Sequence, residues 1–275
     1  MEQLRALQLK ELDILKAVAD VCDELGLTYF LSFGTLLGAV RHGGFIPWDD
    51  DIDIAMPYTD YQKFLAYGQE SLGNLFFVQN METEPDFNFS FTKVRLNGTT
   101  CMNSYQDHWN VHQGIWIDVF PIVPLRGKID FKLSRKVFSL CNFFQLDHGL
   151  KYYYDDYYKL VGGFGIALLR LFYKIPIQTR AKWHKIIVQK MCTRKNRKCR
   201  SVLAGNITTF YSEDVFSEKD TILFEGIPFS APKETDKYLR ITYGDYMQLP
   251  PEEKRRGHIM NIVDLEHDYR KYMKI

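Results

Sequence analysis

The 275-residue sequence predicts an α/β fold, because segments with helical periodicity alternate with short apolar segments typical of strands. Apolar residues recur at three- and four-residue steps over 2–25, which predicts an amphipathic helix that ends at Gly26. Strand-like segments follow at 29–33 and 52–56, and a short helical pattern lies between them at 36–40. The beginning of the chain therefore contains a helix followed by a strand–helix–strand unit.

The rest of the chain continues this alternation. Further strands are predicted at 75–79, 87–96 and 114–121, and a hairpin is predicted to turn near Gly226. Further helices are predicted over about 59–69, 130–147, 178–192 and 233–241. A change in charge and composition near 124–128 predicts a core at 1–124, a mainly helical insertion at 125–220, and a C-terminal segment at 221–275 that completes the core domain.

Composition limits the class of protein. The hydrophobic content of 46% supports one large domain, or a core domain with a helical subdomain. A formal net charge of +1 argues against nucleic-acid binding, which needs a strongly basic surface. Five scattered cysteines without a CxxC motif favour free thiols, and the charged N-terminus has no apolar core of a signal peptide. We therefore expect a cytoplasmic protein.

Chemically informative residues concentrate in 29–56, which read YFLSFGTLLGAVRHGGFIPWDDDIDIAM. Side chains of a strand alternate between its faces, so Asp51 and Asp53 are predicted to share one face while Ile52 and Ile54 point into the core. Two neighbouring carboxylates stay ionised together only with a cation between them. Oxygen ligands beside a phosphate suit Mg²⁺ or Mn²⁺ rather than Zn²⁺.

Gly34 and Thr35 stand where the first strand turns into the short helix. A bare backbone at that point lets amide groups and the helix N-terminus approach a phosphate. A phosphate-binding turn beside a carboxylate pair is typical of metal-assisted phosphoryl or nucleotidyl transfer. We expect Arg41 and His42, in the glycine-rich loop that follows, to bind substrate as well.

Three alternatives compete for the acidic run. A solvated surface turn fits poorly, because the aspartates interleave with Ile52 and Ile54. An EF-hand calcium loop requires glycine and glutamate where this sequence has Ile54 and Asp60. The metal-binding DxD of a nucleotide-sugar glycosyltransferase stays open as a second hypothesis, although one helix and one strand before Gly34 are too little for a nucleotide-sugar-binding unit.

Charged residues also occur within two later strands. Lys93 and Arg95 share one face of the strand predicted at 87–96, either as cations directed at a substrate's phosphates or as a solvent-exposed edge. Asp118 stands between two β-branched apolar residues, which are poor surroundings for an unpaired charge. A salt bridge, a cap at the strand's end or a shared metal ion would compensate that charge, and we favour the metal ion.

Four segments carry a family resemblance: FGTLLGAVRHGGFIPWDDDIDIAM (33–56), KVR (93–95), GIWIDVFPI (114–122) and YGDYMQLPP (243–251). They resemble the LicD family of the nucleotidyltransferase superfamily, which includes phosphocholine transferases and fukutin-related proteins. The resemblance implies a nucleotidyltransferase-like mixed sheet flanked by helices. It also implies transfer of a phosphorylated group, typically phosphocholine from CDP-choline, to a cell-surface glycan. Matched residue by residue, it gives a metal-binding role to Asp51, Asp53 and Asp118.

Three features outside these segments stay open. The strongly basic segment 180–200 is compatible with a solvated helix face and with a patch on the membrane surface. Five tyrosines within 152–158 suggest an aromatic box for choline, but no spacing marks one. His258 lies beside two arginines in a basic tail, where it is a candidate contact of the donor phosphate or a base, or a surface residue.

The sequence therefore predicts a metal-dependent phosphotransferase. Mg²⁺ or Mn²⁺ is expected to bind the diphosphate of a CDP-activated donor such as CDP-choline, and a hydroxyl of a cell-surface or lipid-linked glycan attacks the distal phosphorus. Candidate acceptors are teichoic acid, lipopolysaccharide and capsule precursors, reached from the cytoplasm or the inner face of the membrane. The alternatives are the DxD glycosyltransferase and a family member that binds a glycan without catalysis. The predicted metal-binding and catalytic residues are Asp51, Asp53 and Asp118, and the predicted substrate-binding residues are Gly34, Thr35, Arg41, His42, Lys93, Arg95 and His258.

Overall fold

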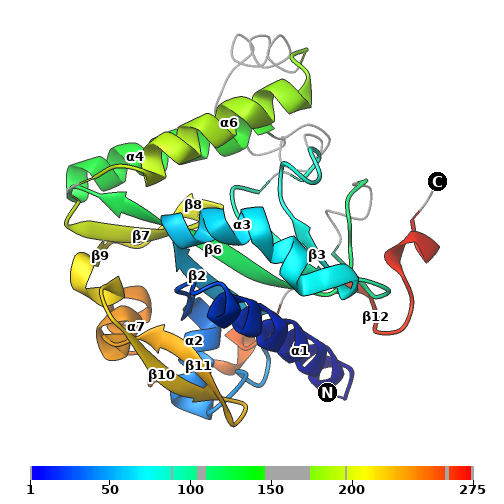
Figure 1. Ribbon diagram of the computed structural model, residues 1–275. Helices are drawn as coiled ribbons and strands as arrows, with labels where there is room; N and C mark the ends of the chain where they lie inside the picture. Colours follow the sequence, from blue (N-terminus) through cyan, green and yellow to red (C-terminus); the bar gives the residue numbers. More distant parts are fainter. Residues whose placement is uncertain are drawn as a thin grey trace.

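A mixed sheet forms the centre of the computed structural model, which describes residues 2–87, 89–103, 110–145, 174–195, 197–257 and 260–273 (Figure 1). Its strand order is β1-β2-β6-β4-β3, with β7 also paired to β6, and with β8 and β9 paired to β7. β2 and β6 run parallel, whereas the other neighbouring strands run antiparallel. The strands are β1 (Phe30–Leu31), β2 (Asp53–Pro57), β3 (Phe76–Gln79), β4 (Thr92–Leu96), β6 (Trp116–Leu125), β7 (Cys199–Ala204), β8 (Asn206–Ile207) and β9 (Tyr211–Ser212).

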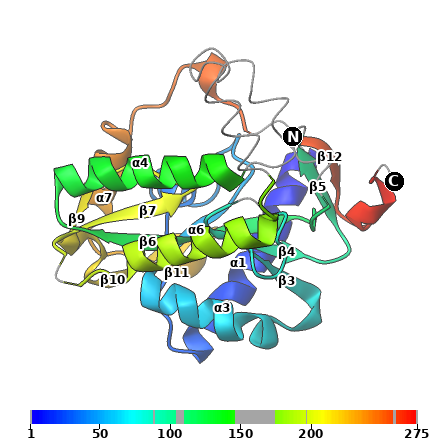
Figure 2. The same ribbon diagram turned by 90° about the horizontal axis from the view of Figure 1, so that it is seen from above.

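Helices cover this sheet in two groups. α1 and α3 pack against each other along one face, in front of β2 and β6 in Figure 1. α4 and α6 run beside each other over the end of the sheet that carries β7 (Figures 1 and 2). The α-helices are α1 (Glu2–Glu24), α2 (Phe33–His42), α3 (Tyr58–Leu72), α4 (Lys128–Gln145), α6 (Ile177–Cys192) and α7 (Thr235–Tyr243), and the short 3₁₀ helices are η1 (Gly73–Leu75), η2 (Glu213–Phe216), η3 (Glu252–Lys254) and η4 (Tyr269–Lys271).

Two small antiparallel pairs attach the C-terminal segment to the rest of the molecule. β10 (Lys219–Phe224) and β11 (Ile227–Pro232) form the predicted hairpin, and β11 packs beside β1. β12 (Met260–Asp264) pairs with β5 (Thr100–Asn103), which lies in the middle of the sequence. The C-terminal segment is thus joined to elements from both the beginning and the middle of the chain.

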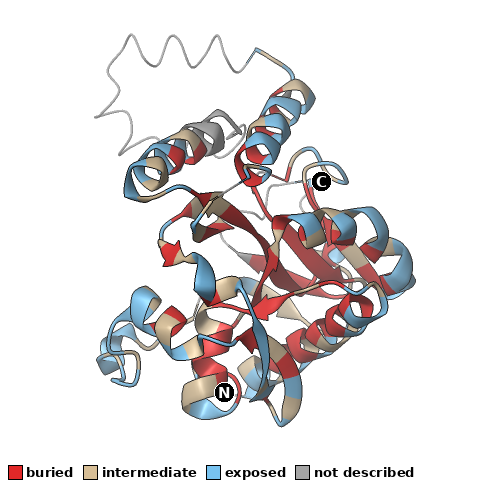
Figure 3. Ribbon diagram, turned by 60° about the vertical axis from the view of Figure 1, so that its left-hand side comes forward, coloured by how far each residue is buried: buried red, intermediate tan, exposed pale blue. Residues whose placement is uncertain are grey.

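The hydrophobic core lies between the sheet and its helices, where Figure 3 shows buried residues on both. The apolar stripe of α1 supplies Ile14, Leu15 and Val18, none of which has measurable exposure. Burial of such side chains contributes about 1.5–3 kcal/mol each relative to the exposed state. The amphipathic helix predicted at 2–25 is therefore confirmed, and Gly26 after it adopts a left-handed φ of +62°.

The structure confirms the predicted α/β class and moves several element boundaries. α2 begins at Phe33, three residues before the predicted helix, and β4 begins at Thr92 rather than at residue 87. The rings of Phe87, Phe89 and Phe91 pack on one another with centroid separations of 5.0–6.4 Å. The alternating pattern in 87–91 therefore belongs to an aromatic cluster that precedes the strand.

The part of the chain predicted as an insertion contains both helices and strands. α4 and α6 account for its helical character, whereas β7 extends the main sheet by pairing with β6. The division of the chain into three parts stays a prediction. None of the helices within the described ranges combines the length and the apolar character that a membrane crossing requires.

Candidate active site

A row of charged side chains crosses the centre of the main sheet. Asp53 on β2 is the register partner of Asp118 on β6. Asp118 is in turn the register partner of Lys93 on β4. Register partners on neighbouring strands point to the same face of a sheet, so the three side chains form a line across three adjacent strands. We call Asp53, Asp118 and Lys93 the carboxylate row.

The carboxylate row lies on the face of the sheet that points away from α3. Tyr61 of α3 shares a hydrogen bond of 2.7 Å between its hydroxyl and Thr92 Oγ1, and Thr92 directly precedes Lys93. Consecutive residues of a strand point to opposite faces. Ile54 and Val119, each next to an aspartate of the row, are fully buried. One face of these strands therefore supplies core packing, while the other carries the charges.

Lys93 neutralises Asp118 within the protein. Its Nζ lies 2.5 Å from Asp118 Oδ1, and both side chains are nearly inaccessible to solvent. The same ammonium group lies 4.4 Å from the ring centroid of Trp116 and 5.4 Å from that of Phe91, within the range of cation–π attraction. Burial lowers the pKa of Lys93, and the charge of Asp118 opposes that shift.

Asp53 carries a charge that is poorly compensated. Burial raises its pKa well above the ordinary value, and the charges of Asp51, Asp118 and Asp49 raise it further, in that order. Its backbone N–H donates a hydrogen bond of 2.8 Å to Thr35 Oγ1. Thr35 is itself buried, so its hydroxyl fixes the position at which β2 begins. A cation beside Asp53 would relieve the repulsion.

A second group of acids lies in the loop before β2. Asp49, Asp50 and Asp51, which we call the acidic loop, each offer a carboxylate oxygen, and these oxygens lie within 4.8 Å of one another. The side chain of Gln8 on α1 donates a hydrogen bond of 2.9 Å to the carbonyl of Asp49. Because Asp51 is the strongest charge acting on Asp53, the acidic loop and the carboxylate row form one electrostatic unit.

The start of α2 lies against the acidic loop. A Cβ atom added to Gly34 would lie 2.6 Å from Asp49 Oδ2, so the carboxylate occupies the space that any other side chain would need. Phe33, just before it, has a φ of +42°, a left-handed conformation that is strained for a bulky residue. The Phe33 N–H donates to the Tyr238 hydroxyl at 3.0 Å, and the Leu36 N–H donates to the Ser32 carbonyl at 3.1 Å. The Gly34 N–H lies between them in the first turn, where amides lack an acceptor within the helix. Backbone N–H groups and carboxylates thus meet at Gly34.

Two residues near the acids were not predicted from the sequence. Glu11 of α1 is buried, and burial followed by the charges of Asp51 and Asp50 raises its pKa well above the ordinary value. It falls on the apolar stripe of the helix, four residues after Leu7 and three before Ile14, which was the signal available. Tyr243, at the end of α7, keeps 43% of its exposure, and partial desolvation followed by the charges of Asp53 and Asp49 raises its pKa.

Arg95 lies on the same face of β4 as Lys93 but has internal partners. It is 1% exposed, its Nε donates to Gln79 Oε1 at 2.6 Å, and its Nη1 donates to the carbonyl of Gly114 at 2.7 Å. Burial lowers its pKa to about 10. The guanidinium also lies 4.9 Å from the ring centroid of Trp116. Arg95 therefore links β4 to Gln79 of β3 and to Gly114, just before β6.

The remaining predicted residues do not join the row. Arg41 and His42 stand at the last turn of α2, at the opposite end from Gly34, where Arg41 Nη1 donates to the carbonyl of Tyr246 at 2.8 Å. Arg41 Nε also donates to His42 Nε2 at 3.0 Å. The hydrogen bond from Arg41 to Tyr246 connects α2 to the loop after α7. His258 lies outside the described residues.

The donor set at this site consists of carboxylate oxygens. Mg²⁺ and Mn²⁺ prefer such oxygens, whereas Zn²⁺ sites in proteins use mainly histidine and cysteine. Burial, and after it the charges of neighbouring aspartates, raises the pKa of Asp53 and of Glu11, so acidic groups are crowded together here with little solvent. The residues present therefore fit a divalent cation with oxygen ligands.

Comparisons with known proteins identify the domain that carries these residues. Residues 26–139, which span α2, the acidic loop and the carboxylate row, match the LicD/FKTN/FKRP nucleotidyltransferase domain. The chain is 29% identical over 270 residues to the lipopolysaccharide cholinephosphotransferase LicD of Haemophilus influenzae, an alignment that covers 93% of this chain and 95% of that protein. The fold and the site thus define a nucleotidyltransferase-type domain.

Two more distant relatives share only part of this chain. Human ribitol 5-phosphate transferase FKRP is 42% identical over 124 residues, which cover 45% of this chain and 22% of that protein. Mannosyltransferase regulator 4 of Saccharomyces cerevisiae is 33% identical over 102 residues, which cover 34% of this chain and 8% of that protein. Residues 26–139 thus carry the LicD/FKTN/FKRP domain that the sequence motifs predict.

Proposed function

We propose that this protein is a metal-dependent phosphotransferase that moves phosphocholine, or a related phospho-alcohol, from a CDP-activated donor to a hydroxyl of a cell-surface glycan. The observation that carries the proposal is the pairing of Asp53 with Asp118 across β2 and β6, directly beside the acidic loop and the start of α2. Carboxylates next to the N-terminus of a helix suit a diphosphate bound together with a divalent cation.

The relatives support the type of group that is transferred. One is named a cholinephosphotransferase acting on lipopolysaccharide, and another is named a ribitol 5-phosphate transferase. Both names describe the transfer of a phosphorylated alcohol, although the alcohols differ. We therefore extend phospho-alcohol transfer to this chain, with phosphocholine as the first candidate because that relative aligns over nearly the whole chain.

In the proposed reaction, Asp51, Asp53 and Asp118 hold Mg²⁺ or Mn²⁺, which would neutralise charge on the diphosphate. Gly34 leaves room for the Asp49 carboxylate beside the start of α2, and the donor's phosphates bind at the N-terminus of that helix. The acceptor oxygen forms a bond to the distal phosphorus, the phosphoanhydride bond breaks, and CMP leaves. The proton of the acceptor hydroxyl passes to a carboxylate of the row. Lys93 positions Asp118 through their ion pair.

A thermal-shift experiment tests the donor. The protein is mixed with CDP-choline, CDP-ethanolamine, CDP-ribitol or a UDP-sugar, each with Mg²⁺ or with EDTA. A ligand that binds only the native state stabilises it by about 2.7 kcal/mol at a concentration of 100 times its Kd. The melting temperature rises as a result. We expect a Mg²⁺-dependent increase with a CDP-alcohol, followed by CMP release on addition of acceptor glycan. A Mg²⁺-dependent increase with the UDP-sugar alone would replace this proposal by the glycosyltransferase hypothesis.

A further inference from the structure

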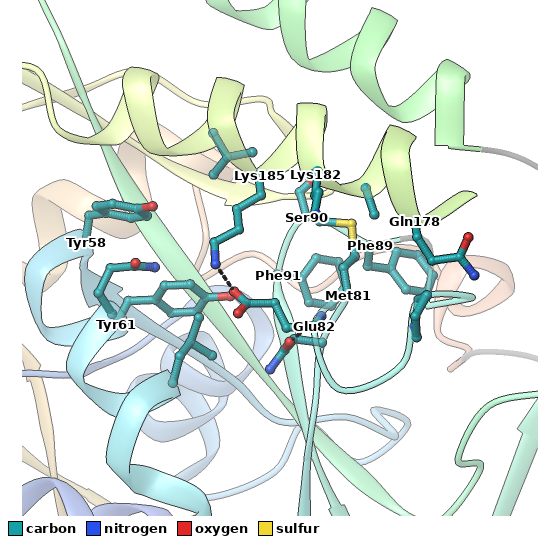
Figure 4. Close-up of a pocket in the computed structure, with 16 residues that line it drawn as sticks. Tyr58, Tyr61, Met81, Glu82, Phe89, Ser90, Phe91, Gln178, Lys182 and Lys185 are labelled. Carbon is teal, nitrogen blue, oxygen red and sulfur yellow. Dashed lines mark hydrogen bonds and ion pairs between the residues drawn. The ribbon is translucent and has the colours of Figure 1, made fainter. Parts of the chain in front are cut away.

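A cavity of about 300 Å³ lies between α3, α6 and the segment 80–91 (Figure 4). Its walls contain none of the residues of the carboxylate row or the acidic loop. This volume is at the lower end of the range of small-molecule sites, roughly 300–1,000 Å³. The cavity is therefore large enough for one sugar ring, and no role described above uses it.

Aromatic rings form much of the cavity wall. Tyr58 and Tyr61 come from α3, and Phe89 and Phe91 come from the segment before β4 (Figure 4). The two tyrosine rings lie 6.2 Å apart at an interplanar angle of 25°, and the two phenylalanine rings lie 5.0 Å apart. Flat apolar surfaces of this kind pack against the C–H faces of a ring-shaped ligand.

Polar groups are distributed between these rings. Gln62, Asn80 and Gln178 line the cavity from three different segments. The amide oxygen of Asn80 already accepts from the backbone N–H groups of Glu82 and Thr83. Amides both donate and accept hydrogen bonds, which suits hydroxyl groups better than it suits ions. A mainly aromatic wall with a few amides is thus complementary to a neutral polyhydroxylated ligand.

The charges at the cavity argue against a cationic ligand. Glu82 Oε1 and Lys185 Nζ lie 2.6 Å apart and link the segment 80–91 to α6, as Figure 4 shows. Lys182 also lines the cavity, so its charged residues are two cations and one anion. An aromatic box for choline gains its affinity from cation–π attraction, which nearby lysines oppose.

The cavity wall is fixed by buried contacts. Ser90 Oγ shares a hydrogen bond of 2.9 Å with His184 Nε2 of α6, and Tyr61 is bonded to Thr92. Phe91 lines the cavity and also lies 5.4 Å from Lys93 Nζ, which holds Asp118. One aromatic layer therefore separates the cavity from the carboxylate row, and the cavity's tyrosines lie on the α3 side of the sheet.

We propose that this cavity binds a neutral sugar residue of the acceptor glycan, remote along the glycan from the residue whose hydroxyl reacts. The assignment of this sugar to the acceptor rests on the proposed function, whereas the binding of a neutral sugar is independent of it. Contacts with a non-reacting part of a substrate position the reacting part, so the cavity contributes to glycan selection without touching the transferred phosphorus.

The test begins with ligand-observed NMR on the whole protein without donor or metal ion. The probes are methyl glucoside, methyl galactoside, methyl N-acetylgalactosaminide, choline chloride and cytidine. We expect saturation transfer to at least one glycoside, with loss of the signal in Ala181→Phe, which fills the cavity from α6. Ala66→Phe is the matched control, because Ala66 is exposed on α3 and does not line the cavity.

A second variant guards against a packing defect in Ala181→Phe. Gln178→Ala removes one amide of the wall at an exposed position without adding bulk, so it is expected to weaken glycoside binding and keep the melting temperature. Absence of glycoside binding to the wild type, binding kept in Ala181→Phe, or binding of choline or cytidine in place of glycosides overturns the inference.

Kinetics separate this inference from the proposed function. With an active donor, Ala181→Phe is expected to raise KM for the acceptor on the order of tenfold while KM for the donor stays constant. Transfer with an unchanged acceptor KM in Ala181→Phe overturns the cavity assignment and leaves the phosphotransferase intact. Glycoside binding without transfer from any CDP-alcohol overturns the phosphotransferase and supports the cavity as a sugar site.

Discussion

Asp53 and Asp118 are register partners on the parallel strands β2 and β6, and among the described residues Lys93 forms an ion pair with Asp118 but not with Asp53. Lys93 holds Asp118 at 2.5 Å, whereas burial and three neighbouring aspartates raise the pKa of Asp53. The two carboxylates of the row are thus chemically unequal. Asp53 is the one whose ionisation would gain most from a bound divalent cation.

Asp53→Asn is expected to abolish turnover and leave the fold intact. The amide keeps the size of the side chain but removes a charge that the metal-free protein compensates poorly. We expect CMP release to fall by at least about 100-fold, as is usual when a group that stabilises transition-state charge is lost. The melting temperature in EDTA should stay the same or rise. Full activity of Asp53→Asn would contradict the metal assignment.

Gly34→Ala tests the close approach between α2 and the acidic loop. The new Cβ would lie 2.6 Å from Asp49 Oδ2, so the carboxylate must move away. We expect loss of Mg²⁺-dependent donor binding in the thermal-shift experiment. Gly127→Ala is the control, because a Cβ there meets no atom within 4 Å. Equal donor binding by the two variants would show that Asp49 has no part in the site.

The sequence predicted those parts of the site that depend on local pattern. Alternation along the strand placed Asp53 and its neighbours Ile52 and Ile54 on opposite faces. Gly34, predicted at a strand-to-helix turn, lies in the first turn of α2, and its contact with phosphate stays a prediction. The pairing of β2 with β6 is a tertiary relationship that one sequence does not contain. The family resemblance supplied Asp118 as the third carboxylate for that reason.

Residues on other elements were missed because their position depends on packing. Glu11 reaches the acids only because α1 packs against β6 and β4, and Tyr243 only because α7 packs against α2. For Arg95, the face of the strand was predicted but the burial of the side chain was not. Its alternation with Lys93 indicated a shared face, but periodicity does not reveal that neighbouring strands and Trp116 cover the guanidinium.

Lys93→Met tests whether the buried ion pair stabilises the metal-free protein. The substitution leaves Asp118 without its cation among aromatic side chains, and breaking a buried ion pair in this way costs about 3–5 kcal/mol. Urea unfolding in EDTA measures the loss. The double variant Lys93→Met/Asp118→Asn removes both charges and is expected to recover much of it. A double variant no more stable than Lys93→Met would show that the cost comes from lost packing.

Glu11→Gln is expected to stabilise the protein at high pH and to have little effect at low pH. The folded state raises the pKa of Glu11 through burial and the charges of Asp51 and Asp50, so the folded state holds its proton more tightly than the unfolded state. Stability contributed by the protonated carboxyl is complete below the unfolded pKa of about 4.3 and is lost as the pH rises towards the raised folded pKa. Glutamine is neutral at every pH and escapes this loss.

The comparison of the two proteins isolates Glu11 from the other titrating groups. His112 and His184 have pKa values lowered by burial to about 3 and about 4, so they favour the folded state more strongly as the pH rises through the acidic range. They are common to the wild type and Glu11→Gln, and their contribution cancels in the difference between the free energies of unfolding. Urea unfolding in EDTA at pH 5 and pH 8 measures that difference. A larger advantage for Glu11→Gln at pH 8 is expected, whereas a constant difference would mean that Glu11 is ionised in the folded protein and compensated by groups around it.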